Sequence, residues 1–156
     1  MKIRSSSAAS ITVGLHQKSN GRIYLPLVLS CNHTTPLWRL PTGEVEREES
    51  GEEAAIRETK EETGLIVCNL YHIDTKEVES KDKRYDIHLK HVYVGQIMSL
   101  DGFLPTVVDG EDHLICEIFS REDVVTAIRN NGPLSGHRMM NTHADFFTEV
   151  MKKIFD

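Results

Sequence analysis

The sequence predicts an α/β (α+β) fold in which a mixed β-sheet lies between helices as an α/β/α sandwich. Strand-like apolar segments separated by turn residues fill much of the chain before its last two helices. Three segments carry helix signals, and two of these are bunched near the C-terminus. The 156 residues, 39% hydrophobic and 27% charged, have the size and composition of one globular domain, which we expect to span 1–156.

Segments rich in Val, Ile, Leu and Tyr predict the strands. The turn Ser19-Asn20-Gly21 separates the first two of them, and Asp101-Gly102 and Asp109-Gly110 mark later loops. The predicted strands cover residues 10–17, 23–30, 65–74, 85–97 and 114–119.

Two helices are predicted after the last strand. Ser120 caps the first of them, which runs over 121–130 and ends before Gly132-Pro133. The second, near 142–155, is amphipathic. Its expected core face has helical spacing and consists of Phe147, Val150, Met151 and Ile154.

The net charge of −6 comes from 24 Asp and Glu against 18 Lys and Arg. The whole excess lies in residues 44–62, which hold nine Glu and three Lys or Arg, whereas the rest of the chain is balanced. An acidic chain is not expected to bind nucleic acid or an anionic membrane through charge. An acidic cluster can still serve anionic substrates if divalent cations lie between them.

The three cysteines, Cys31, Cys68 and Cys116, form no C-x-x-C pair and are odd in number. This pattern indicates reduced thiols and a cytoplasmic protein. The Ser-rich segment 1–10 lacks the apolar core of a signal peptide, and no stretch approaches the length of a membrane span.

The acidic segment contains the first predicted helix. Ser50 and Glu53 form an S-x-x-E capping box, and the helix runs to about Thr63, with Gly64 as its stop. Three of its carboxylates, Glu58, Glu61 and Glu62, lie within an arc of about 100°. They repel one another and lie near the negative end of the helix dipole. A hard divalent cation would compensate this cost, whereas composition alone favours a solvated helix face.

The spacing favours the cation. The chain reads Gly43, five residues, Glu49, seven residues, then R-E-T-K-E-E-T-G-L up to Leu65. This resembles the signature of the Nudix hydrolases, G-x5-E-x7-R-E-U-x-E-E-x-G-U, where U is aliphatic. Seven fixed residues and the last aliphatic one match, which by chance has a probability on the order of 10⁻⁸.

The match has three departures from the commonest form. Thr59 stands at the internal aliphatic site, where its methyl can pack and its hydroxyl can bond the preceding turn. Thr42 and Glu48 each replace a frequent Gly and can alter the shape of the loop, and with it the substrate preference. The preceding segment from Trp38 to Pro41 is similar to the strand that leads into this motif, and Trp38 is either a core residue or a base-stacking one.

The resemblance implies a set of site residues. Glu58, Glu61 and Glu62 would ligate Mg²⁺, or Mn²⁺ as a substitute, with the Gly43 carbonyl as a further ligand. Arg57 and Glu49 would pair to fix the loop against the helix. The catalytic residues would then be Arg57, Glu61 and Glu62, joined by a general base from the helix or a later loop. Glu111 is the candidate for this base or for an extra metal ligand, with Asp112 next, and the alternative is that both belong to a solvated acidic turn.

The resemblance also implies the activity, which is metal-dependent hydrolysis of a diphosphate bond by attack of water on phosphorus. The substrate would be a small nucleotide: ADP-ribose, NADH, a nucleoside triphosphate or a sugar nucleotide. A homodimer is common in the family, although no segment here identifies an interface. The alternative is a non-catalytic Nudix-fold module that senses a nucleotide or binds a partner.

Overall fold

Three helices and eight strands are formed by residues 5–155, the part of the chain that the computed structural model describes. The helices are α1 (Gly51–Thr63), α2 (Arg121–Asn130) and α3 (Asn141–Phe155). The strands are β1 (Ser6–Gln17), β2 (Ile23–Ser30), β3 (Trp38–Arg39), β4 (Thr42–Glu44), β5 (Val67–Glu79), β6 (Ile87–Ile97), β7 (Thr106–Asp109) and β8 (Asp112–Ser120). None of these helices is long and apolar enough to cross a membrane.

The strands follow one another in the order β5-β6-β1-β2-β8-β7, with β3 paired to β2 and β4 paired to β1. Strands β1 and β6 run parallel, and every other described pair is antiparallel. The sheet is therefore mixed, and the predicted fold class is confirmed.

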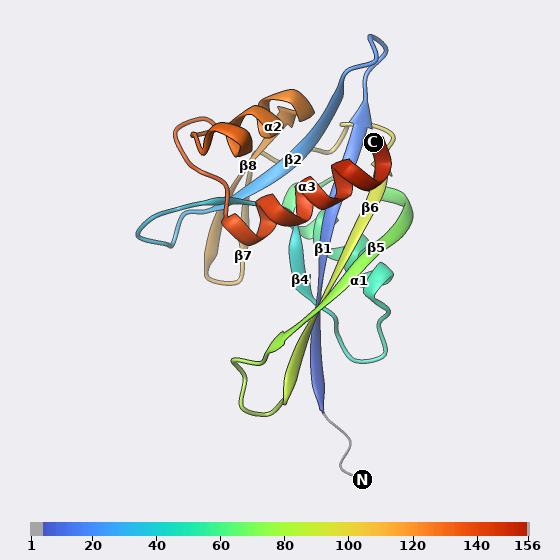
Figure 1. Ribbon diagram of the computed structural model, residues 1–156, viewed down its shortest axis with the longest axis vertical. Coiled ribbons are helices and arrows are strands. Elements are labelled where there is room, and N and C mark those ends of the chain that lie inside the picture. The colour runs from blue at the N-terminus through green and yellow to red at the C-terminus, as the bar shows by residue number, and fades with distance from the viewer. Residues whose placement is uncertain (1–4, 156) are drawn as a thin grey trace.

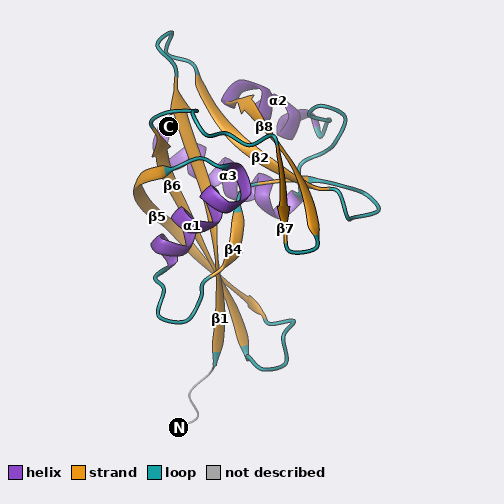
Figure 2. Cartoon of the chain, turned by 180° about the vertical axis from the view of Figure 1, so that it is seen from behind, coloured by secondary structure: helices purple, strands orange, loops and turns teal. Residues whose placement is uncertain are grey.

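Helices cover both faces of this sheet. Successive side chains of β1 point to opposite faces, so one set contacts α1 and the other contacts α3. Ser10 points to α1, where its hydroxyl donates to the Gly51 carbonyl, and Ile11 and Val13 point the other way. On that side they meet Phe147 and Val150 of α3 in the main core cluster. In Figure 1, α3 crosses in front of the strands and α1 lies behind them; Figure 2 shows the opposite side.

There are more strands than predicted; β1, β5 and β8 are longer than predicted, β2 has its predicted bounds, and β6 begins two residues later. Strand β1 begins at Ser6 and β5 continues to Glu79, because main-chain pairing with β6 extends past the apolar segments. Strand β4 was not predicted. Strand β7 was not predicted either: it ends at Asp109, which was predicted to lie in a loop, and it forms a hairpin with β8. The N-terminal residues 1–4, part of the segment judged not to be a signal peptide, lie outside the described residues, as does residue 156.

The predicted core face of α3 is partly wrong. Phe147 and Val150 are fully buried, but Ile154 is 46% exposed because it lies in the last turn, past the core cluster. Trp38 is a core residue, and its indole N–H donates to the Leu134 carbonyl at 2.7 Å. The three cysteines are unpaired, as predicted; Cys31 is exposed and Cys116 is buried.

A buried histidine ties α3 to the strand before the motif. The Leu40 backbone N–H donates to His143 Nδ1 at 3.0 Å, so this nitrogen carries no proton. Burial, together with the smaller effect of the positive charges of Arg39 and Lys90, lowers the pKa of His143 to about 3. The folded protein therefore keeps this imidazole neutral.

We expect this histidine to make the protein less stable as the pH falls. Between pH 6.5 and 3 the unfolded chain binds a proton that the folded protein does not, so the free energy of unfolding falls by up to about 1.4 kcal/mol per pH unit. The variant His143→Asn keeps an acceptor for Leu40 but does not titrate. Denaturant unfolding between pH 6.5 and 4.5 gives the free energy of unfolding as a function of pH. Its slope against pH should be shallower for His143→Asn than for the unmodified protein, whereas the control variant His33→Asn, at an exposed histidine, should keep the slope of the unmodified protein. Equal slopes for all three proteins would contradict the prediction.

Candidate active site

Helix α1 carries the acidic residues at a fixed position on the sheet. Ser50 is its N-cap, and the predicted capping box with Glu53 is present in both directions. The helix ends at Gly64, whose φ of 77° is the left-handed conformation that glycine adopts readily. Both predicted ends are confirmed.

One helix residue departs from its predicted contacts. Thr59 is fully buried, but its hydroxyl has no hydrogen-bond partner among the described residues, so the predicted bond to the preceding turn is wrong. The hydroxyl of Thr63 makes that type of bond instead, donating to the Thr59 carbonyl at 2.6 Å.

We expect Thr59→Val to stabilise the protein. Valine has nearly the same shape and removes a buried polar group without a partner, which costs about 1–3 kcal/mol in proteins. The free energy of unfolding should rise by about 1 kcal/mol, measured by denaturant unfolding. Thr63→Val is the matched control and should destabilise, because that hydroxyl is bonded. A loss of stability in Thr59→Val would contradict the prediction.

The backbone of β4 lies directly against the helix at Gly43. A Cβ on this residue would overlap the side-chain carboxyl of Glu58, so only glycine leaves room for it. Burial raises the pKa of Glu58 to about 7, with smaller contributions from Glu62 and Glu61, while Arg57 opposes the rise. A carboxylate held in such a cleft favours a neighbouring cation, because a cation restores its charged form.

Arg57 joins the helix to the loop that precedes it. Its Nε donates to Glu49 Oε2 at 2.8 Å and its Nη2 to Glu49 Oε1 at 3.0 Å, so the predicted ion pair is present. The same guanidinium donates to the Glu44 carbonyl at 2.9 Å and to Glu58 Oε1 at 2.6 Å. Arg57 holds the pKa of Glu49 below its ordinary value. One side chain thus fixes both the loop and Glu58.

Glu62 is held by a residue that the sequence did not single out. Its side chain is 2% exposed and accepts two bonds from Arg39, Nη1 to Oε1 at 3.1 Å and Nη2 to Oε2 at 2.6 Å. The Thr42 backbone N–H donates to Oε1 at 2.9 Å. Each carboxylate oxygen has two lone pairs, so Oε2 can still take another partner.

A third carboxylate joins the two from the helix. Oxygen atoms of Glu58, Glu62 and Asp109 all lie within 4.8 Å of one another. Asp109 is exposed and ends β7, whose hairpin with β8 lies against α1. These are hard oxygen donors beside the opening at Gly43, a set that fits Mg²⁺ or Mn²⁺.

Other predicted residues lie outside this cluster. Glu61 is half exposed, with Oε2 at 3.3 Å from Arg57 Nη1. Glu111 is in the β7–β8 turn, where its carbonyl accepts a hydrogen bond from Asn32 at 2.7 Å. Neither Glu111 nor Asp112 contributes an oxygen to the three-carboxylate cluster.

The alternation of side-chain directions along β7 explains why Asp109, and not Glu111, joins the acidic cluster. Val107 packs on the small core cluster of Val28, Leu114 and Cys116. Asp109 is two residues further along the strand and so shares its inward face. A prediction of β7 as a strand would have singled out Asp109, because Glu111 falls in the turn.

The structure thus combines a mixed sheet between helices with three carboxylates that converge beside a close-packed glycine. A sequence model described as "NUDIX domain" matches residues 12–137. The chain belongs to the Nudix family.

Similar proteins differ in what they bind. A stretch of 73 residues is 37% identical to "Putative 8-oxo-dGTP diphosphatase YtkD" of Bacillus subtilis (strain 168), covering 47% of this chain and 44% of that protein, less than half its length. The Nudix domain of Shewanella oneidensis NrtR, complexed with ADP ribose, superposes with a TM-score of 0.69 over 99% of this chain and 90% of that one, at 16% identity. A Caenorhabditis elegans Ap4A hydrolase gives 0.64 over 95% and 97%, at 18% identity. These two likenesses show the fold.

Proposed function

We propose that the protein is a metal-dependent pyrophosphohydrolase that cleaves the diphosphate bond of a small nucleotide. The observation that supports this most directly is the convergence of oxygens from Glu58 and Glu62 of the Nudix motif with those of Asp109, beside Gly43. Both a diphosphate substrate and these carboxylates are anionic, so a divalent cation is needed between them.

In this proposal Glu58, Glu62 and Asp109 hold Mg²⁺ or Mn²⁺, and the Gly43 carbonyl is a further ligand. A bound ion would neutralise the diphosphate and make a coordinated water more acidic. Glu61, exposed beside Arg57, takes the proton of the attacking water and so replaces Glu111 as the proposed base. Asp109 joins the proposed metal ligands. The water oxygen bonds to one phosphorus as the bridging P–O bond breaks and the second phosphate departs.

A cavity next to the motif supports a nucleotide-sized substrate. It has a volume of about 720 Å³, which suits a small ligand. Its lining includes Glu44, the residue after Gly43. Its lining combines basic and aromatic side chains with acidic ones: Arg47, Lys81, Arg84, Tyr85, His88 and Lys90 on one hand, and Glu44, Glu46, Glu79 and Asp82 on the other. We propose that the nucleoside lies there with its phosphates directed to Glu58.

The test is an assay with about 5 mM Mg²⁺ and a panel of nucleotides, in which products are separated by chromatography. The panel contains ADP-ribose, 8-oxo-dGTP, Ap4A, NADH and a sugar nucleotide, which covers the ligands named for similar proteins. Release of a nucleoside monophosphate or of phosphate, dependent on the metal, supports the proposal. No turnover of any compound, with or without Mn²⁺, would overturn it.

A nucleotide-sensing module is the second candidate, favoured by the likeness to the ADP-ribose complex of NrtR. Another structure of NrtR, complexed with a 27mer DNA, is covered over 61% of its chain. The acidic excess of this chain argues against DNA as a partner. Calorimetry separates the two candidates, since a sensor binds ADP-ribose and leaves it intact.

We expect Mg²⁺ to raise the melting temperature. An ion that binds only the folded protein with a Kd of about 1 mM adds about 1.4 kcal/mol at about 10 mM, which corresponds to about 3–6 °C. Thermal unfolding with and without Mg²⁺ measures the shift. Glu58→Gln should lose it, while Glu52→Gln, an exposed acid of the first helical turn, should keep it. A melting curve that ignores Mg²⁺ would count against the cation site.

We also propose a cytoplasmic location, supported by the three unpaired cysteines. We propose in addition that the protein is a homodimer, which is common in the family. Sedimentation velocity would measure its oligomeric state.

A further inference from the structure

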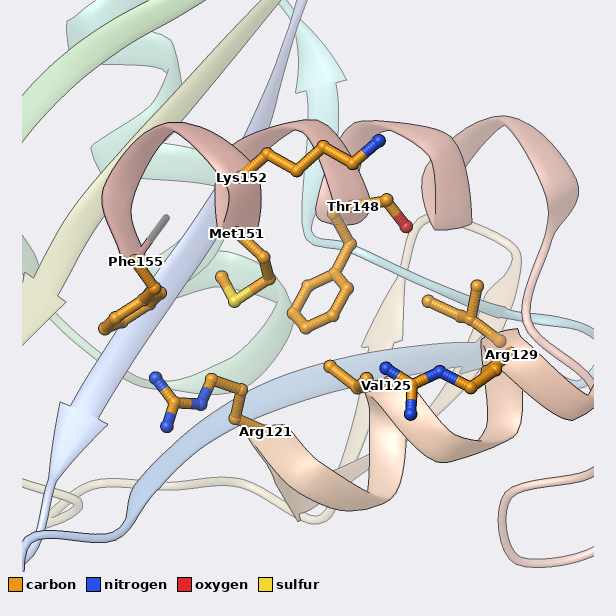
Figure 3. A pocket seen from close by; sticks show the side chains of 9 residues that line it. Arg121, Val125, Arg129, Thr148, Met151, Lys152 and Phe155 are labelled. Atoms are coloured by element: carbon orange, nitrogen blue, oxygen red, sulfur yellow. The ribbon is translucent and has the colours of Figure 1, made fainter.

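A second cavity lies between α2 and α3, and none of the residues that line it belongs to the Nudix motif. It has a volume of about 640 Å³, and one stripe from each helix lines it. The stripe of α2 is Arg121, Val125, Ile128 and Arg129, and that of α3 is Phe147, Thr148, Met151, Lys152 and Phe155. Figure 3 shows Met151 pointing from α3 toward the space between Arg121 and Arg129.

The floor of this groove is apolar and continuous with the main core. Phe147 is 1% exposed, and Val125, Ile128 and Met151 are partly buried hydrophobic residues that pack against the core cluster. Phe155 closes one end, with the Arg121 guanidinium 4.3 Å from its ring centroid. An apolar body placed in this groove would therefore be removed from water on both sides.

The rim is basic in a protein that is acidic overall. Its charged lining residues are Arg121, Arg129 and Lys152, and no Asp or Glu is among the lining residues that the structure describes. Arg121 also forms an ion pair with Glu122, with 3.5 Å between Arg121 Nη2 and Glu122 Oε1. Neither Arg129 nor Lys152 forms an ion pair within residues 5–155. Two cations on an apolar groove, without counter-ions among residues 5–155, are complementary to an anion with an apolar body.

We propose that this groove binds a small amphipathic anion: a carboxylate, sulfonate or phosphate head on an apolar tail or ring system. The head binds at the rim that carries Arg129 and Lys152, and the body lies along Val125, Phe147 and Met151. The size of the groove favours a free small molecule, because nine lining residues are fewer than the roughly 20–30 that a protein partner needs on each side. The volume is within the usual range for small-molecule sites, about 300–1,000 Å³.

The test uses monomeric dodecanoate as the probe and the full chain as the protein. Calorimetry should give one site, and NMR amide shifts should be confined to α2 and α3. The variant Arg129→Gln/Lys152→Gln should weaken the Kd about tenfold or more. The matched control Arg22→Gln/Lys83→Gln removes one Arg and one Lys from elsewhere on the surface and should bind as the unmodified protein does. Dodecyltrimethylammonium, with the opposite charge on the same tail, should bind at least about tenfold more weakly than dodecanoate.

Several outcomes would overturn the proposal. These are no binding of dodecanoate, equal weakening in both double variants, equal affinity for the cationic probe, and binding only to anionic vesicles. Nucleotide hydrolysis is not used in any of these measurements, so they stand apart from the proposed function. An unchanged melting temperature of each variant confirms that the fold is intact.

Discussion

Glu58→Gln is expected to lower nucleotide turnover by about 10³-fold, because a lost ligand removes several kcal/mol of charge stabilisation from the transition state. The substitution keeps the size of the side chain and one oxygen that can still accept the bond from Arg57. The fold should therefore survive, and circular dichroism with thermal unfolding checks this. The reaction rate at saturating substrate and Mg²⁺ is the measurement.

Two further variants make this test specific to the cluster. Asp109→Asn removes the carboxylate that β7 supplies and should also lower turnover. Glu111→Gln, only two residues away in the turn, should leave turnover unchanged, because Glu111 lies outside the cluster. The reverse pattern, with Glu111→Gln inactive and Asp109→Asn active, would restore the assignment made from the sequence and contradict the one made from the structure.

Arg39→Met is expected to destabilise the protein by about 3–5 kcal/mol, because it leaves the buried Glu62 carboxylate without its counter-ion. Burial lowers the pKa of Arg39, but the hydrogen bonds that it donates to Glu62 and the charge of that carboxylate raise it above its ordinary value. The Thr42 N–H would be the one described hydrogen-bond donor left to that carboxylate. Denaturant unfolding at pH 7 measures the loss.

Burial is the variable that this prediction isolates. Arg84 makes a similar two-point pair with Asp82, at 2.7–3.2 Å, but on the surface. Arg84→Met should leave the free energy of unfolding within experimental error, because exposed ion pairs contribute little. The double variant Arg39→Met/Glu62→Gln should recover part of the loss, since no buried charge is left unpaired. Equal effects of Arg39→Met and Arg84→Met would contradict this account.

Local signals predicted the helices well. Ser50 with Glu53, Gly64 and Ser120 are residues whose side chains or backbone conformations act within one turn, so a single sequence shows where α1 begins and ends and where α2 begins. The Arg57–Glu49 pair was likewise implied by the motif and is present. The fold class followed from the order of these elements and the apolar segments.

Contacts between distant segments could not be predicted in the same way. The position of Asp109 depends on β7 pairing with β8 and lying on α1, and the partner of Glu62 comes from β3. The exposure of Ile154 depends on the cavity that it lines together with residues of β1, β5 and β6. The motif itself gave no sign that the Thr59 hydroxyl would be enclosed without a partner.

The site has a consequence for how the protein assembles. Glu58 and Asp109 are remote in the chain and meet only when the β7–β8 hairpin docks on α1. A chain with the hairpin detached would keep the helix and its charges but would have no cation site. A bound ion would act as a reversible cross-link that closes a loop of about 50 residues, and its binding energy would strengthen that one joint. Completion of the fold and the capacity to hold the ion are then a single event.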